Sequence, residues 1–124
     1  KDRAEVPAPW ATTFSGLYHR ATNEDPYRLP PRWVEGKAKL NLVTPFNFVS
    51  TADITGGNSG SPTVNRKGEL VGIVFDGNIE SLPNTFLYSD EYARAVHVAT
   101  QGIVEALVKL YPAGRLLDEL GVKR

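Results

Sequence analysis

Hydrophobic and polar positions alternate most clearly in the middle third of the chain. Residues 40–44 (LNLVT) and 46–50 (FNFVS) mix aromatic or branched aliphatic side chains with polar ones, and this alternation favours strands. Residues 62–65 and 69–75 flank the turn Arg66-Lys67-Gly68, so they predict a β-hairpin whose glycine takes a positive φ. The second hairpin strand, ELVGIVF, is almost wholly apolar, and we expect it to be buried on both faces.

The first third of the chain is interrupted by prolines and predicts only short helices. Residues 12–20 (TTFSGLYHR) suggest one helix that begins near Thr13 or Ser15. Pro30-Pro31 opens a second helical turn through Lys37, because proline is well placed at a helix start. We interpret residues 1–39 as an irregular connecting arm.

A helical period runs through the last third of the chain. Apolar residues fall at three- and four-residue steps from Tyr92 to Leu110, which predicts one surface helix over 90–111 that begins at Ser89 or Asp90. We expect a loop or short strand over 79–88 and a short tail helix over 115–120. The expected fold is mainly β with a C-terminal helix. It divides into the arm, a β-barrel segment over 40–88, and C-terminal helices over 89–124 that pack on the barrel.

Composition narrows the possible functions. The chain has 124 residues, enough for one domain, and its 14 Lys and Arg balance 14 Asp and Glu, so nothing indicates a nucleic-acid or membrane partner. The absence of cysteine excludes a thiol nucleophile, disulfides and cysteine metal sites; we expect no cofactor or metal. No apolar run is long enough to span a bilayer.

Methionine is absent even at position 1, and no signal peptide is present. We therefore expect a processed form or an excised piece, with catalytic partners upstream of Lys1.

The segment 55–62 (TGGNSGSP) carries the clearest candidate chemistry. Ser59 lies between glycines, two residues after Gly57, and a proline closes the segment. A serine nucleophile needs such a tight loop, because backbone N–H groups must converge on the oxygen of the tetrahedral intermediate. We predict Ser59 as the nucleophile and the N–H groups of Gly57 and Ser59 as the oxyanion hole. The alternatives are an ordinary Gly/Ser turn and a phosphate-binding loop, which the lack of a following lysine disfavours.

No convincing general base accompanies Ser59. The two histidines are His19, in the proline-rich arm, and His97, within the expected C-terminal helix. The order His19, Asp25, Ser59 imitates that of trypsin-like enzymes, but the interval leaves no room for the barrel that carries the histidine and aspartate there. We interpret His97 as a residue on the surface or flank of the helix.

Two aspartates and a glycine are candidates for substrate binding. Asp76 and Gly77 end the second hairpin strand, where they suit a simple turn, a cation site or an open pocket. Asp53 lies six residues before Ser59, the position at the base of the specificity pocket in trypsin-like enzymes, where an acid suggests a preference for basic side chains. The spacing alone does not choose between these roles.

Residues 42–62 (LVTPFNFVSTADITGGNSGSP), continued by 72–78 (GIVFDGN), resemble the C-terminal part of the S46 dipeptidyl-peptidases, which are bacterial serine exopeptidases. The resemblance extends from residues 12–17 through LPPRW at 29–33 into the last helix. It implies a trypsin-like double β-barrel, of which this chain supplies the second, nucleophile-bearing barrel. Ser59 matches the family's nucleophile, and its histidine and aspartate partners are implied to precede Lys1.

The resemblance also implies roles for the residues that follow the hairpin. Asp76 matches an acid that binds the free α-amino group of the substrate. Gly77 matches the position where an arginine pairs with acidic P1 side chains, P1 being the residue before the cleaved bond, and where a glycine leaves room for apolar ones. The chain thus resembles the dipeptidyl-peptidase 7 type, with a hydrophobic P1 preference. On this resemblance Asp53 is not a selector of lysine or arginine.

The implied parent enzyme is a periplasmic or surface-located bacterial homodimer that removes dipeptides from peptides with a free N-terminus. We expect the isolated chain to be inactive, and to self-associate through apolar surface that the rest of the parent covers. Other functions stay open: a binding or pseudo-peptidase domain, a dimerisation segment built around the expected helix over 90–111, and a small hydrolase that uses His19.

Overall fold

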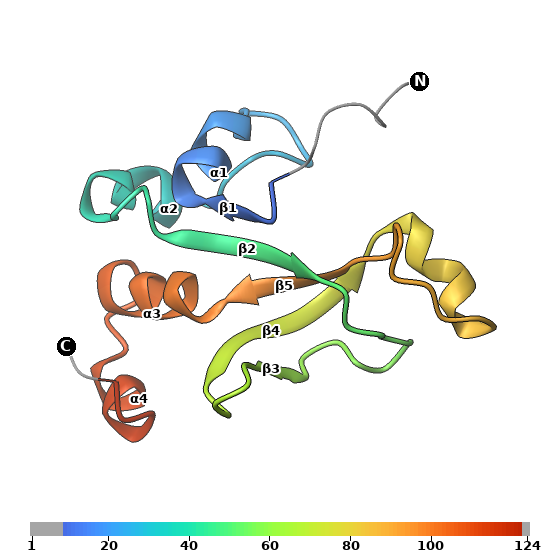
Figure 1. Cartoon of the computed structure of the whole chain (residues 1–124). Coiled ribbons are helices and arrows are strands. Elements are labelled where there is room, and N and C mark those ends of the chain that lie inside the picture. Colours follow the sequence, from blue (N-terminus) through green and yellow to red (C-terminus); the bar gives the residue numbers. More distant parts are fainter. Residues whose placement is uncertain (1–8, 123–124) are drawn as a thin grey trace.

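The computed structural model describes residues 9–122. A five-stranded antiparallel sheet forms its centre, with the strand order β1-β2-β5-β4-β3 (Figure 1). The strand that comes last in the sequence is therefore the middle strand of the sheet. The strands are β1 (Ala11–Thr13), β2 (Pro45–Ser50), β3 (Pro62–Val64), β4 (Leu70–Gly77) and β5 (Ala95–Ala99).

Short helices lie at both ends of this sheet. At one end, α1 and α2 lie beside β1 and β2, and α3 and α4 lie below them; the 3-10 helix η2 lies at the opposite end (Figure 1). Helix α3 packs against β2, β4 and α4. The helices are α1 (Phe14–Arg20), α2 (Pro31–Gly36), η1 (Lys37–Lys39), η2 (Ile79–Thr85), α3 (Thr100–Lys109) and α4 (Gly114–Glu119).

An aromatic cluster joins the N-terminal helices to the sheet. The fully buried ring of Phe14 lies 5.7 Å from the ring of Trp33 and 5.3 Å from that of Phe46, between ring centroids. The buried side chains of Leu40 and Leu110 complete this cluster. Residues 9–39 thus contribute an edge strand and part of the core. They hold β2 on the side that faces away from β5.

Several sequence predictions are confirmed. The helices expected over 12–20 and from Pro30 are α1 and α2, the tail helix is α4, and the hairpin is β3–β4 with Gly68 at φ 77°. The strand expected over 40–44 is wrong. The side chain of Asn41 accepts a hydrogen bond from the Val43 N–H, and its carbonyl accepts one from the Thr44 N–H, so a turn forms there.

The helix expected over 90–111 is also wrong in its first half. Residues 95–99 form β5, which pairs with β2 on one side and β4 on the other, and helix α3 begins only at Thr100. Ala95, His97 and Ala99 are buried in alternation, so the segment follows the period of a strand. Residues 79–85 form η2 where a loop or short strand was expected.

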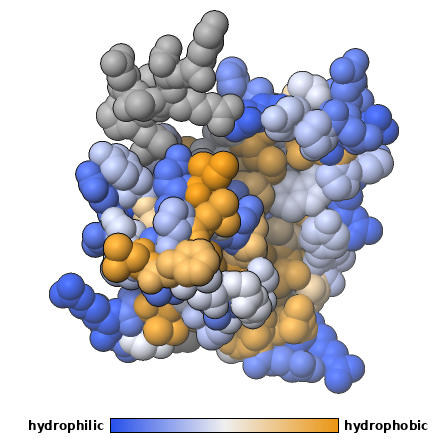
Figure 2. Space-filling model, turned by 90° about the vertical axis from the view of Figure 1, so that its right-hand side faces the viewer, coloured by the Kyte–Doolittle hydropathy of each residue, from blue (hydrophilic) through white to orange (hydrophobic). Residues whose placement is uncertain are grey.

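Strand β4 is not buried on both faces as its apolar sequence predicts. Gly72 and Val74 are buried, whereas Leu70 and Phe75 are exposed in this chain. More apolar surface lies around η2, where Ile79, Leu82, Phe86 and Leu87 are exposed, Phe86 to 93%. Figure 2 shows hydrophobic side chains gathered at the centre of the face at this end of the molecule. Such a patch is typical of a surface that another part of a protein covers.

Candidate active site

Residues 51–61, which we call the Ser59 loop, connect β2 to β3. The backbone carbonyl of Thr55 accepts a hydrogen bond from the Asn58 N–H at 3.2 Å, and the Asn58 side chain accepts one from the Thr55 N–H at 2.7 Å. Gly57 and Gly60 have φ of 99° and 91°, values that residues with a Cβ rarely adopt. These two glycines allow the sharp turn that brings Ser59 to the surface of the sheet.

The Ser59 loop is fixed to β4 by the two residues that directly follow the serine. The Gly60 N–H donates to the Val74 carbonyl at 2.8 Å, and the Val74 N–H donates to the Ser61 carbonyl at 3.0 Å. The Ser59 hydroxyl itself donates to the Phe75 carbonyl at 3.4 Å. Strand β4, the second strand after the serine in sequence, therefore fixes the position of Ser59.

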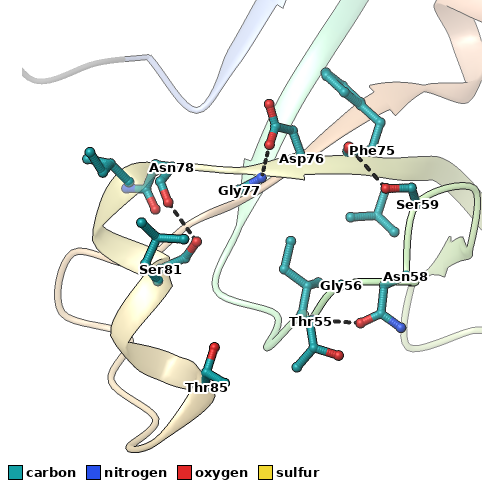
Figure 3. A pocket seen from close by; sticks show the side chains of 14 residues that line it. Thr55, Gly56, Asn58, Ser59, Phe75, Asp76, Gly77, Asn78, Ser81 and Thr85 are labelled. Carbon is teal, nitrogen blue, oxygen red and sulfur yellow. Dashed lines mark hydrogen bonds between the residues drawn. The ribbon is translucent and has the colours of Figure 1, made fainter.

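A β-bulge interrupts β4 at the same point. Val74 pairs with His97 and Asp76 pairs with Val96, so Phe75 is the extra residue. In Figure 3 the side chains of Phe75 and Asp76 lie on the same side of β4, away from the Ser59 loop. Bulges of this kind re-aim side chains beside functional sites, and this one sets the direction of Asp76, the residue that directly follows Phe75.

A cavity of about 400 Å³ lies between the Ser59 loop, β4 and η2, and we call it the Ser59 cavity (Figure 3). Ser59 lies at one side of it and Ser81 and Thr85 of η2 lie at the other. The lining residues are Ile54, Thr55, Gly56, Asn58, Ser59, Val74, Phe75, Asp76, Gly77, Asn78, Ile79, Ser81, Leu82 and Thr85. A cavity of this size suits a ligand of a few residues at most.

The predicted oxyanion-hole residues meet one requirement of that role. Within residues 9–122, neither Gly57 nor Ser59 donates its backbone N–H to an acceptor, whereas the N–H groups of Asn58, Gly60 and Ser61 all do. Two uncommitted donors flanking Asn58, one of them on the serine itself, are what the stabilisation of a developing oxyanion needs.

Asp76 and Gly77 both line the Ser59 cavity. The Asp76 carboxylate is exposed and accepts a hydrogen bond from the Gly77 N–H at 2.8 Å. Asp53, by contrast, is exposed in the Ser59 loop and is not among the residues that line the cavity. The structure thus brings Ser59, Asp76 and Gly77 together and leaves Asp53 outside.

Neither histidine contacts Ser59. His19 is exposed in the last turn of α1. The sequence predicted His97 on the surface or flank of a helix, and this is wrong. His97 is buried in β5 with 1% exposure, because it occupies an inward position of the middle strand. Its Nε2 is 2.8 Å from Ser50 Oγ and its Nδ1 is 2.8 Å from Thr63 Oγ1. Burial lowers the pKa of His97 below its usual range and so favours the neutral ring.

Sequence reasoning missed the contribution of η2 to the cavity. Ser81, Leu82 and Thr85 line it, but residues 79–85 carry no period that marks a helix. The local signal is the pair Asn78 and Ser81, three residues apart, where the Ser81 hydroxyl donates to the Asn78 carbonyl at 2.6 Å.

Among residues 9–122, no group of three or more His, Cys, Asp and Glu could hold a metal ion. No helix in the same range is long and apolar enough to cross a membrane.

The fold and the site together define a class. An antiparallel sheet that presents a serine hydroxyl on a glycine-bordered loop, beside a substrate-sized cavity and two uncommitted N–H groups, has the arrangement of the nucleophile part of a serine hydrolase. The model of the family described as Peptidase S46 matches residues 1–122. The chain belongs to this peptidase family.

Relatives and solved structures agree with this assignment. The chain is 44% identical over 105 residues to the Asp/Glu-specific dipeptidyl-peptidase of Shewanella putrefaciens, a match that covers 79% of this chain and 14% of that protein. It is 37% identical over 131 residues to dipeptidyl-peptidase 7 of Capnocytophaga gingivalis, covering 98% of this chain and 18% of the relative. The chain therefore spans less than one fifth of the length of either relative.

The crystal structure of Porphyromonas endodontalis DPP11 in complex with the dipeptide Arg-Glu is similar over the whole of this chain and 19% of that one, with 28% identity and a TM-score of 0.86. Its mainly antiparallel sheet with helices is thus the fold of this chain. Relatives named for Asp/Glu specificity and relatives named dipeptidyl-peptidase 7 both match, so their names do not select a substrate.

Proposed function

We propose that this chain is the nucleophile-bearing part of a larger S46 dipeptidyl-peptidase that removes dipeptides from the free N-termini of peptides. One observation carries the proposal: the Ser59 hydroxyl lies at the side of the Ser59 cavity, in a loop whose Gly57 and Ser59 N–H groups donate to no acceptor within residues 9–122. Membership of the S46 family supports the reaction class.

Ser59 acts as the nucleophile in the proposed reaction. Its oxygen attacks the carbonyl carbon of the second substrate residue while a general base accepts the hydroxyl proton. The N–H groups of Gly57 and Ser59 stabilise the oxyanion. The base then returns the proton to the departing amine, and water hydrolyses the acyl-enzyme to release the dipeptide and regenerate Ser59.

The general base comes from outside this chain in our proposal. The exposed side chain of His19 lies in α1, and both ring nitrogens of His97 are within hydrogen-bond distance of the hydroxyls of Ser50 and Thr63. Neither can accept the proton of Ser59 in this arrangement. We therefore propose that the parent's histidine and aspartate lie in preceding sequence, on the first barrel of a trypsin-like double barrel, and that the isolated chain is inactive.

Asp76 binds the substrate's α-amino group in this proposal. Asp76 lines the Ser59 cavity and directly follows Phe75, whose carbonyl accepts the hydrogen bond from the Ser59 hydroxyl. A carboxylate fixed at this place pairs with an ammonium group two residues before the cleaved bond, and this explains release of dipeptides rather than single residues.

The lining of the Ser59 cavity supports a hydrophobic P1 preference. None of the 14 described lining residues is lysine or arginine, and the charged side chain among them is the acidic Asp76. The nearby Arg94 is engaged elsewhere: its guanidinium lies over the Trp10 ring at 5.0 Å and donates to the carbonyls of Asp90 and Ala93. An acidic P1 side chain would find no counter-charge, whereas Ile54 and Leu82 offer apolar contact.

The apolar patch around η2 fits a piece of a larger protein. We propose that the rest of the same polypeptide covers Ile79, Leu82, Phe86 and Leu87, because the relatives are more than five times as long as this chain. We further propose, from the family alone, that the parent is a homodimer located in the periplasm or at the cell surface. The isolated chain should self-associate through this patch.

The proposal is tested with the full-length protein and dipeptidyl fluorogenic substrates that carry leucine or aspartate at P1. We expect turnover of the leucine substrate, a loss of at least about 1,000-fold on Ser59→Ala, and no turnover of N-acetylated substrates. Preference for aspartate would refute the hydrophobic P1 site while leaving Ser59 in place. No Ser59-dependent turnover of either substrate would favour a pseudo-peptidase.

A further inference from the structure

His97 connects the two ends of the Ser59 loop. Its Nε2 lies 2.8 Å from the hydroxyl of Ser50, the last residue of β2, and its Nδ1 lies 2.8 Å from the hydroxyl of Thr63 in β3. The Ser59 loop, residues 51–61, begins directly after Ser50 and ends directly before β3. One side chain of β5 therefore contacts the strand that enters the loop and the strand that leaves it.

The hydrogen bonds continue from this ring into the loop. The Ser50 hydroxyl also accepts a hydrogen bond from the Ala52 N–H at 3.2 Å, which fixes the first turn of the loop. Thr63 is paired with Gly72 of β4, the strand whose residues Val74 and Phe75 hold the other end of the loop. Through Ser50 and Thr63, the His97 ring is thus connected to the segments before and after Ser59.

The ring itself is closely confined. It stacks on the Phe48 ring with 4.6 Å between centroids and an interplanar angle of 13°, and it is 1% exposed. Phe48 in turn lies over Gly72, where a Cβ would come within 2.5 Å of its ring. A ring held this way has one orientation, in which both nitrogens meet a hydroxyl.

Packing alone does not explain a histidine here. Its neighbours on the buried face of β5 are Ala95 and Ala99, and an apolar ring would fill the same space without the cost of burying two polar nitrogens. The hydrogen bonds to the loop ends are what histidine adds. Because a displacement of about 1 Å in a reacting group can lower a rate roughly 100-fold, a side chain that fixes both ends of the loop affects catalysis.

We propose that His97 is a positioning residue that ties β2 to β3 and thereby holds Ser59 and its oxyanion-hole amides in place. It is not the general base, because it reaches the site only through Ser50 and Thr63. The catalytic part of this inference rests on the proposed function of Ser59, whereas the structural part concerns the loop alone.

The test uses the full-length protein and two independent measurements. The first is amide hydrogen exchange of residues 51–61, which needs no activity. The second is the rate at which a fluorophosphonate, a small serine-directed reagent, labels Ser59. The main variant is the triple substitution Ser50→Ala, Thr63→Val and His97→Phe, because removing a polar group together with its partners leaves nothing buried without a hydrogen bond. His97→Phe alone is the second variant: it keeps the Ser50 hydroxyl that accepts the Ala52 N–H, so faster exchange in this variant comes from loss of the hydrogen bonds of the ring.

We expect the triple variant to keep the stability of the sheet while exchange within residues 51–61 quickens by about 10-fold or more and labelling slows about 10- to 100-fold. Tyr18→Phe is the control: it removes a hydrogen bond from a part-buried side chain to the Trp33 carbonyl, outside the Ser59 loop and its two strands, and should change neither measurement by more than about 3-fold.

Two results would overturn the proposal: unchanged exchange within residues 51–61 of the triple variant, or faster exchange with unchanged labelling. If the wild-type serine is not labelled at all, the proposed function fails, and exchange alone then decides whether His97 holds the loop.

Discussion

The Oγ atom of Ser81 lies 2.6 Å from the position that a Cβ atom on Gly77 would occupy. The Ser81 hydroxyl is held there by its hydrogen bond to the Asn78 carbonyl, and Ile54 Cδ1 lies 3.4 Å from the same position. The space beside Gly77 is therefore already shared by two side chains, and its shape depends on them as much as on the glycine.

Gly77→Ala should lower kcat/KM for the leucine substrate, because the new methyl group forces Ser81 out of its hydrogen bond. Overpacking of this kind costs about 1–3 kcal/mol of stability, and a displacement of about 1 Å at the site can lower the rate by up to roughly 100-fold. Removing the Ser81 oxygen relieves the collision, so Gly77→Ala with Ser81→Ala should recover most of the loss. Equal activity of the single and double variants would show that Ser81 does not shape the pocket.

Asp76→Asn should weaken turnover of substrates with a free N-terminus. A hydrogen bond to a charged group contributes about 1.5–3 kcal/mol, so we expect kcat/KM to fall roughly 10- to 150-fold. Because the site recognises a charge, the variant should also discriminate less against N-acetylated substrates. If kcat/KM for free-amino substrates is unchanged, another group binds the α-amino end.

Stability of the 124-residue chain should depend on pH through His97. Burial lowers the pKa of His97 in the folded state below its ordinary value of 6.5, so the unfolded chain binds a proton first as the pH falls. His97 should therefore leave the free energy of unfolding unchanged above pH 6.5. Below pH 6.5 the free energy of unfolding should decrease by at most about 1.4 kcal/mol per pH unit, until the pH reaches the folded-state pKa of His97. Urea unfolding at several pH values measures this slope, which His97→Phe should lack.

Gly102→Ala should destabilise the fold, because helix α3 packs closely on β2. An added Cβ would lie 2.8 Å from the Pro45 carbonyl oxygen, a backbone atom that cannot rotate away, and we expect a loss of about 1–3 kcal/mol. The matched control is Gly16→Ala in α1, where the new methyl group would meet nothing within 4 Å beyond its chain neighbours and the backbone of its own helix. That change should stabilise the helix by about 0.5–1 kcal/mol. Thermal unfolding compares the two variants, and equal effects would contradict the packing argument.

Features set by local chemistry were predictable from the sequence. Proline at the start of α2, glycine in the β3–β4 turn, and the sharp Ser59 loop all follow from what a few neighbouring residues allow. The assignment of Asp76 and Gly77 to the site of Ser59 rested on the family resemblance, and all three residues line one cavity.

Features set by distant pairing were not predictable. The apolar spacing around Val96 fits a helix, and only pairing with β2 and β4 makes residues 95–99 a strand. His97 was placed on a helix surface for the same reason, so its contacts with Ser50 and Thr63 were missed. Ser81 was missed because the conformation of η2 depends on its packing beside the end of β4.

The strand order has a consequence for how the protein is made. During synthesis the β1–β2 pair and the β3–β4 hairpin both leave the ribosome before β5, the strand that lies between them in the finished sheet. Until residue 99 has been added, these two halves share no ladder of backbone hydrogen bonds, and His97 has not yet joined Ser50 to Thr63. The assembly of the sheet therefore waits for its non-local contacts, and Ser59 reaches its final position only after β5 has been synthesised.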